Sequence, residues 1–318
     1  MENLLSVGDC VGLAIRQCRR DVKFLATKLL LPSVIELVGK LFLVSGARVF
    51  LASLHGGIPG PETLSALGPS LIGFLICIPA EVWLTMLQLS YVRMVVNRST
   101  DFNLAFKQVR HKFWAVILYA VGYYAAFFVW VFAWAFMFGI ASFLAKVGAG
   151  GAGGAIVMVP VILAMIVIAL INLVLLLLPG SVLFVVLACE DKGFFQIIGR
   201  AYAMTFKRLF PTAGFCCVLF VTWMALFLAL TSVLQIFYGA EYMKAGVYTG
   251  KKHAGEIQMP LYVQIIGGSW NSIIYMYLMP VFFLASGYYY YSLRMRLEGL
   301  DISNGIELLE QKRNAVSG

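Results

Sequence analysis

Charged side chains are scarce in this sequence. Only 12% of the residues are Asp, Glu, Lys or Arg, whereas 61% are hydrophobic. A soluble domain carries about 25% charged residues. A surface this poor in charge cannot face water over most of its area. The composition therefore excludes an ordinary soluble domain and indicates a protein embedded in lipid.

Paired cysteines and catalytic motifs are also missing. The six cysteines form no Cys-x-x-Cys pair, and the three histidines fall in three different loops. We find no HExxH, GxSxG, phosphate loop or Ser/His/Asp order. The sequence thus predicts no disulfide framework, no metal site, no cofactor and no enzyme activity, and the cysteines are interpreted as small apolar fillers. The adjacent acids Glu190 and Asp191 are interpreted as a solvated loop rather than a catalytic dyad.

Long apolar runs are what the sequence has in abundance. A helix needs about 20 apolar residues to cross a bilayer, and open strands cannot satisfy their backbone in lipid. No small-residue cleavage site follows a short apolar core, so we expect the first run to stay in the protein. The prediction is an all-α integral membrane protein of one domain, 1–318, with six transmembrane helices near 24–50, 69–92, 113–144, 155–189, 209–237 and 260–290.

The orientation follows from the basic residues. Of the 24 Lys and Arg residues, 17 lie on the side of the two termini, five lie in loops on the other side, and Lys28 and Lys40 lie within the first span. Cytoplasmic loops carry the excess of Lys and Arg. We therefore expect a multi-pass protein of the bacterial cytoplasmic (inner) membrane with both termini in the cytoplasm.

An internal repeat accompanies these spans. Residues 11–22 align without gaps to 102–113, and a weaker third copy runs from Phe195 through Gly199 and Tyr202 to Phe206. The apolar positions fall on one helix face, which predicts an amphipathic cytoplasmic helix before each odd-numbered span. The opposite face is basic, and the residues that we assign to lipid or partner contact are Arg16, Arg19, Arg20, Lys107, Arg110, Lys112, Arg200, Lys207 and Arg208.

Two interpretations of these helices remain open. In one, the apolar faces lie at the acyl boundary and the basic faces meet anionic lipid headgroups. In the other, the helices pack against a soluble partner in the cytoplasm. Nucleic acid is not expected as a partner, because the membrane interface already accounts for the basic and aromatic residues.

The even-numbered spans repeat through proline. Pro79, Pro179 and Pro280 are 100 and 101 residues apart, and each precedes the first cytoplasmic basic residue by 13 or 14 positions. Each proline leaves a carbonyl without its helical donor, so we expect a kink that either lines a cavity or only shapes packing. Together the patterns predict three parallel two-helix repeats at about 9–100, 101–192 and 193–300, with a cytoplasmic tail at 301–318.

Three segments resemble a known bacterial family. They are 185–193 followed by Arg200 and 206–210, then 105–107 with 112–114, and finally the Tyr-rich end of the last span. The arrangement resembles the glycerophosphoryl diester phosphodiesterase membrane-domain family. Its motif Tyr-Tyr-Asp-Leu-Arg-x-Arg-x-Glu-Gly-x-Asp places family residues at Arg294, Arg296, Glu298, Gly299 and Asp301, while Ser292 replaces the first Asp. The phosphodiesterase barrel is absent, so the resemblance implies the membrane fold and not the enzyme activity.

Three ionisable residues lie inside the predicted membrane region. Glu36 and Lys40 are spaced i, i+4 in the first span, and Glu81 follows Pro79 in the second. Intramembrane charge indicates either a polar pathway or an ion pair that neutralises itself. The leading hypothesis is a non-catalytic scaffold or accessory subunit that contacts anionic lipid, a cytoplasmic partner or both. The alternative is a transporter or channel for a small or lipidic solute that uses Glu36, Lys40 and Glu81.

Overall fold

The computed structural model describes residues 5–55, 61–119, 178–244 and 261–299, with a few isolated residues between 121 and 168. Within these ranges the chain is helical and has no strand. Four of the described helices contain segments that are long and apolar enough to cross a membrane: Val22–Gly46, Gly68–Val96, Leu209–Glu241 and Ile265–Glu298. They coincide with the first, second, fifth and sixth predicted spans. The described chain thus has the helices of a multi-pass membrane protein.

The third and fourth predicted spans lie largely outside the described residues. Of the third, residues 113–119 are described and helical. Of the fourth, the described part is the apolar helix α7 (Leu178–Cys189), in which Pro179 is the second residue. The prediction of six spans therefore stays a prediction.

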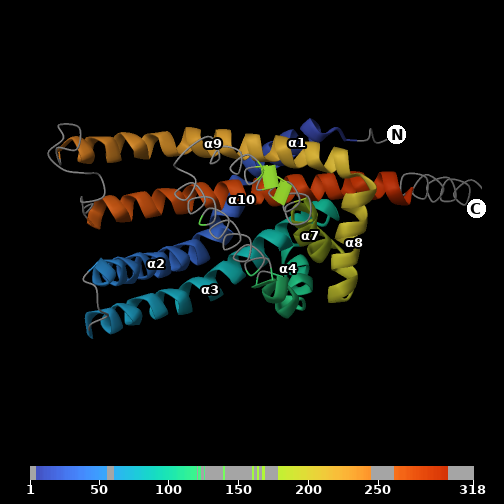
Figure 1. Ribbon diagram of the computed structural model, residues 1–318. Helices are drawn as coiled ribbons and strands as arrows, with labels where there is room; N and C mark the ends of the chain where they lie inside the picture. The colour runs from blue at the N-terminus through green and yellow to red at the C-terminus, as the bar shows by residue number, and fades with distance from the viewer. Residues whose placement is uncertain are drawn as a thin grey trace, which may run out of the picture.

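Two antiparallel pairs of long helices make up most of the described structure (Figure 1). One pair is α2 (Val22–His55) with α3 (Pro61–Val96), and the other is α9 (Leu209–Lys244) with α10 (Leu261–Glu298). Helix α10 contacts α2, α3, α7 and α9, so it holds the two pairs together. It also continues beyond the predicted boundary at Tyr290, and Arg294, Arg296 and Glu298 therefore lie on its last turns.

Three short helices gather at one end of the molecule, where α10 ends (Figure 1). They are α1 (Val7–Arg20), α4 (Phe102–Arg110) and α8 (Phe194–Lys207). The side chains of Ser6 and Asp101 cap the first turns of α1 and α4 by accepting backbone N–H hydrogen bonds. The longer helices α2 and α9 begin within two residues of the ends of α1 and α8, and α4 is followed by the described helical residues 113–119. We refer to this part of the molecule as the charged end.

Small side chains pack each short helix against the protein. The buried residues include Cys10, Ala14 and Cys18 in α1, Ala105 and Val109 in α4, and Ile197, Ala201 and Thr205 in α8. The predicted alignment of 11–22 with 102–113 pairs Ala14 with Ala105 and Cys18 with Val109, all of them buried. The expectation that this face of α1 meets acyl chains is wrong, because α1 packs on α10 and α9.

Helix α8 departs from the other two in its large apolar residues. Phe195, Gly199 and Phe206, named as apolar positions of the third copy, lie on its exposed side, with Phe195 82% exposed. The physical reason is the close packing of α8 on its neighbours, which admits Ala201 and Ile197 but leaves the large rings outside. These exposed rings leave both interpretations of the third copy open, contact with lipid or with a soluble partner.

Glycine sets the contact between α2 and α3. A Cβ atom on Gly73 would lie 2.7 Å from the backbone nitrogen of Leu43 and 2.8 Å from the carbonyl oxygen of Gly39. A Cβ atom on Gly39 would lie 3.0 Å from the backbone nitrogen of Cys77. Only residues without a side chain permit this approach, which is the usual way in which membrane helices gain packing energy.

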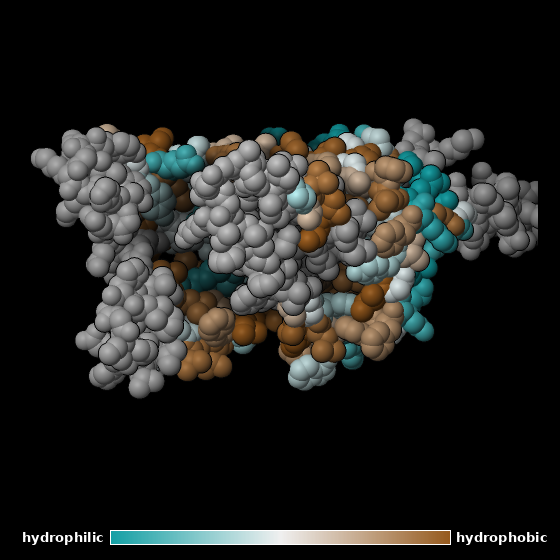
Figure 2. All heavy atoms as spheres, viewed as in Figure 1, coloured by the Kyte–Doolittle hydropathy of each residue, from teal (hydrophilic) through white to brown (hydrophobic). Residues whose placement is uncertain are grey.

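Apolar side chains cover the sides of the long helices. Helix α9 exposes Phe220, Val221 and Ile236, and α3 exposes Leu71 and Leu75. Figure 2 shows hydrophilic residues concentrated where α8 and the last turns of α10 lie. A body with apolar sides and a polar end fits a bilayer, because burying the apolar sides in lipid removes them from water.

Candidate functional site

The link between α7 and α8 contains the two adjacent acids. Helix α7 ends at Cys189, and Gly193 caps the start of α8. Glu190 is only 7% exposed, whereas the side chain of Asp191 is 69% exposed. The interpretation of this pair as a solvated loop is therefore wrong for Glu190. The reason is that α8 and α10 surround its carboxylate with donors.

The Glu190 carboxylate joins three segments of the chain. Its Oε1 atom accepts hydrogen bonds from the Arg200 guanidinium of α8 and from the Tyr290 hydroxyl of α10. Its Oε2 atom lies 3.0 Å from the Lys192 ammonium. Burial alone would raise the pKa of Glu190, but the hydrogen bonds from Tyr290, Arg200 and Lys192 outweigh it and hold the pKa below its ordinary value. Glu190 is therefore a carboxylate at neutral pH.

Asp191 joins two further segments. The Arg93 guanidinium of α3 donates to both of its oxygens, at 3.2 and 3.1 Å, and the Lys112 ammonium lies 2.9 Å from Oδ1. These two cations lower the pKa of Asp191 to about 2. The Arg93 side chain is buried, and its bidentate geometry makes this contact directional.

The same two cations also cap the C-terminus of α7. The last carbonyls of a helix lack intrahelical donors and carry partial negative charge. Arg93 donates to the carbonyl of Ala188 at 2.7 Å, and Lys112 donates to those of Leu187 and Glu190 at 2.9 and 2.6 Å. Burial lowers the pKa of Lys112 despite the hydrogen bond that its ammonium donates to Asp191. The end of α7 is thus fixed by α3 and by the segment after α4.

The network reaches the end of α10 through Arg200. Besides Glu190, Arg200 pairs with Glu298, and Glu298 accepts a 3.0 Å hydrogen bond from Arg294. Of the predicted family residues, Arg294 and Glu298 therefore belong to this network. Gly299 follows α10 with a positive φ of 62°, a conformation that favours glycine and ends the helix. Arg296 instead donates to the carbonyl of Leu5 at 3.3 Å, and Asp301 lies outside the described residues.

We call this group of residues the Glu190 network: Arg93, Lys112, Glu190, Asp191, Lys192, Arg200, Tyr290, Arg294 and Glu298. Sequence reasoning assigned Lys112, Arg200, Arg294 and Glu298 to contact or family roles. It did not assign Arg93, Glu190, Lys192 or Tyr290 to a site. The available signal was the acidic pair at the end of an apolar run whose surroundings are otherwise basic.

The other predicted basic residues lie on the surface, outside the Glu190 network. Arg16, Arg19 and Arg20 of α1 are exposed, and so are Lys107 and Arg110 of α4 and Lys207 and Arg208 of α8. Arg20 lies 3.6 Å from Asp21. The structure therefore separates the basic residues of this end into an inner set, paired within the Glu190 network, and an outer set on the surface.

The predicted intramembrane residues lie away from this network, in α2 and α3. Lys40 and Glu36 form the expected ion pair at 2.5 Å, and the Lys40 ammonium lies 5.7 Å from the centre of the Tyr275 ring. Glu81 is exposed on α3, next to Pro79, which lies inside that helix as Pro280 lies inside α10. Nothing in these positions gathers Glu36, Lys40 and Glu81 into the Glu190 network.

Metal ligands do not cluster in the part of the chain that the structure describes. There, no group of three or more His, Cys, Asp and Glu side chains could hold an ion. All six cysteines are free thiols, and Cys10 and Cys18 are completely buried, as expected of apolar fillers.

Comparison with protein-family models, with curated proteins and with solved structures found no match for this chain. The resemblance to the phosphodiesterase membrane-domain family therefore stays a prediction that rests on its short motifs.

Proposed function

We propose that this chain is a non-catalytic scaffold or accessory subunit of the bacterial cytoplasmic membrane. In this proposal it has six spans in three two-helix repeats, with the charged end and both termini in the cytoplasm. The charged end contacts anionic lipid headgroups, a cytoplasmic partner or both. The family resemblance supports the same architecture.

The observation that carries the proposal is the Glu190 network. Every oxygen of the Glu190 and Asp191 carboxylates has a cationic or hydroxyl partner. A general base needs a pKa near the working pH and access to a substrate proton. Here the pKa values of both acids are lowered, and their lone pairs hold α3, α7, α8 and α10 together. Such acids are suited to architecture rather than to proton transfer.

The network also explains why an outer basic surface is available. The acids of the network pair with the inner cations, and among the described residues only Arg20 of the outer cations forms an ion pair, with Asp21. A basic residue close to an anionic leaflet contributes about 1 kcal/mol of attraction. Large exposed rings on the adjacent segments, Trp114, Phe195 and Phe210, suit the boundary between lipid and water. Fixed basic helices beside such rings support contact with anionic headgroups.

The transport alternative receives less support. The Glu36–Lys40 pair neutralises itself within one helix, at 2.5 Å. A pocket of about 610 Å³ lies at the charged end, and its lining includes neither these residues nor Glu81. Both observations favour the interpretation of the pair as a packing feature.

A lipid-retention experiment tests the proposal. The protein would be extracted in neutral detergent, and the retained lipid would be identified by mass spectrometry. We expect the wild type to retain more anionic than neutral lipid. Replacing five exposed cations by Gln, namely Arg16, Arg19, Arg20, Lys107 and Arg110, should remove most of that excess.

The matched control is Lys244→Gln, since Lys244 is exposed near the opposite end of α9. It should retain anionic lipid as the wild type does. If the five-residue variant retained as much anionic lipid as the control, lipid contact by these helices would be excluded, and a soluble partner would be the remaining role for them.

A further inference from the structure

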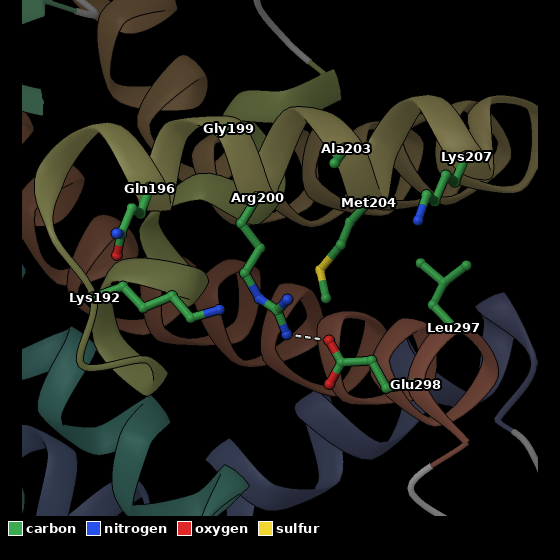
Figure 3. A pocket seen from close by; sticks show the side chains of 9 residues that line it. All are labelled: Lys192, Gln196, Gly199, Arg200, Ala203, Met204, Lys207, Leu297 and Glu298. Atoms are coloured by element: carbon green, nitrogen blue, oxygen red, sulfur yellow. Dashed lines mark hydrogen bonds and ion pairs between the residues drawn. The ribbon is translucent and has the colours of Figure 1, made fainter.

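A pocket opens beside the Glu190 network, between α8 and the last turns of α10 (Figure 3). Its volume is about 610 Å³. All nine lining residues come from α8, the link before it and α10, and five of them are polar and four apolar. The lining residues are Lys192, Gln196, Gly199, Arg200, Ala203, Met204, Lys207, Leu297 and Glu298.

Positive charge exceeds negative charge around this pocket. Lys192, Arg200 and Lys207 line it, and Arg294 lies behind Glu298. The acids within reach are Glu190, which pairs with Lys192 and Arg200, and Glu298, which pairs with Arg200 and Arg294. Four cations thus face two carboxylates. Lys207 forms no ion pair with any described residue, and Figure 3 shows its ammonium directed toward α10.

Shape and polarity restrict the ligand further. Gly199 leaves one wall open, because a Cβ atom built on it would meet nothing within 4 Å. Met204 and Leu297 supply apolar surface next to the cations (Figure 3). An anion with several oxygens can bond to more than one of these cations at once, and a phosphate group carries −1.5 to −2 charge when singly esterified. That negative charge matches the excess of two positive charges around the pocket.

We propose that this pocket binds a phosphate group, carried either by a soluble phosphate ester or by the headgroup of an anionic lipid. Lys207 and Lys192 contact the phosphate oxygens, Arg200 orients them, and the Met204–Leu297 side accepts the organic part of the ligand. The proposal deepens the proposed function and rests on it only in placing this end of the protein at the cytoplasmic face.

The test uses the full-length protein in neutral detergent with three probes: inorganic phosphate, dioctanoyl phosphatidic acid and dioctanoyl phosphatidylcholine. Affinity would be measured by isothermal titration calorimetry. The wild type should bind at least one of the first two probes at least tenfold more tightly than the phosphatidylcholine. Tight binding of inorganic phosphate identifies a soluble phosphate as the ligand, whereas binding of the phosphatidic acid alone identifies a lipid headgroup.

Two variants close or neutralise the pocket. Gly199→Leu adds a side chain to the pocket lining at a position where a Cβ atom meets nothing within 4 Å, and Lys207→Gln removes a cation that has no ion pair among the described residues. Each change should weaken binding at least tenfold. Their matched controls are Gly214→Leu on α9, where a Cβ atom also meets nothing within 4 Å, and Lys23→Gln, an exposed cation outside the pocket. The controls should bind as the wild type does.

Two outcomes would overturn the proposal. One is that the wild type binds neither phosphate probe more tightly than the phosphatidylcholine. The other is that Gly199→Leu and Lys207→Gln bind as tightly as their controls, which would make the attraction a general property of the basic surface. The five-residue variant of α1 and α4 leaves the pocket intact, so it should keep binding at the pocket even if it loses its excess of retained lipid.

Discussion

The α2–α3 pair and the Glu190 network are held together by opposite means. In the α2–α3 pair, Gly39 and Gly73 bring two backbones into direct contact, and the outward side chains are apolar. In the network, four carboxylate oxygens of Glu190 and Asp191 join α3, α8, α10 and the segment after α4. The α2–α3 pair depends on residues without side chains, whereas the Glu190 network depends on long charged side chains.

The difference follows from the surroundings of each region. Between helices in lipid there is no hydrophobic driving force, so close packing must supply the attraction. At the membrane boundary the ends of helices expose unpaired carbonyls, and Lys or Arg can bond to them. The two regions should therefore respond differently to changes in size and in charge.

The largest effect is expected from Glu190→Leu. The change leaves the Tyr290 hydroxyl without its partner and removes one of the two acids that pair with Arg200. Breaking a buried ion pair costs about 3 kcal/mol of unfolding free energy. Denaturant unfolding in mixed micelles would measure it. Lys244→Leu, which removes the 71% exposed partner of Glu241, should cause little change. Equal effects of the two variants would show that the network does not hold the charged end together.

Gly73→Ala tests the opposite region and should cost about 2 kcal/mol, because the new methyl group must push α2 and α3 apart. Gly68→Ala in the same helix is the control, since a Cβ atom there meets nothing within 4 Å. The control should be neutral or slightly stabilising, as Ala favours helix over Gly. The unfolding temperatures of both variants would be measured. Equal shifts in the two temperatures would contradict the close approach of the two helices.

The Glu36–Lys40 ion pair of α2 should be more sensitive to the loss of one partner than to the loss of both. Lys40→Leu alone leaves the largely buried Glu36 carboxylate unpaired and should destabilise the protein by about 1 kcal/mol. Glu36→Leu combined with Lys40→Leu should be less destabilising than the single change. The comparison requires unfolding curves for both variants under one condition. Wild-type stability of both would mean that the ion pair contributes nothing.

The smallest expected effect is a change in folding stability with pH in the acidic range. The pKa of Asp191 is about 2 when folded against an ordinary 3.8, so its stabilisation is complete above about pH 4 and is lost as the pH falls toward 2. Because the Asp191 side chain is 69% exposed, solvent screens the pair and the contribution stays below about 1 kcal/mol. Asp191→Asn should flatten the stability profile between pH 4 and 2, and an unchanged slope would contradict the pairing.

Periodicity and composition predicted much of the fold. The positions of α2, α3, α9 and α10, and the short helices before α2 and α9, follow from runs of apolar residues and from one-sided patterns. What these patterns could not show was which partner covers each apolar face. The face of α1 with Cys10, Ala14 and Cys18 is compatible with either lipid or protein, and only the position of α10 decides between them.

The site was less accessible to sequence reasoning. Arg93, Lys112, Glu190 and Arg200 are separated by up to about a hundred residues, and their contact depends on how α3, α7 and α8 meet in space. Two adjacent acids in a loop resemble a solvated turn when their neighbours are unknown. By contrast, the Glu36–Lys40 pair was predictable, because residues spaced i, i+4 on a helix always lie close together.

We propose that the charged end faces the cytoplasm. Fusions of a reporter that is active only outside the cytoplasm, and of one active only inside it, test this directly. We expect fusions at residue 105 and at the C-terminus to report the cytoplasm, and fusions within 55–62 and 244–256 to report the outside. A C-terminus that reports the outside would contradict the orientation, and with it the contact with a cytoplasmic leaflet on which the proposed function depends.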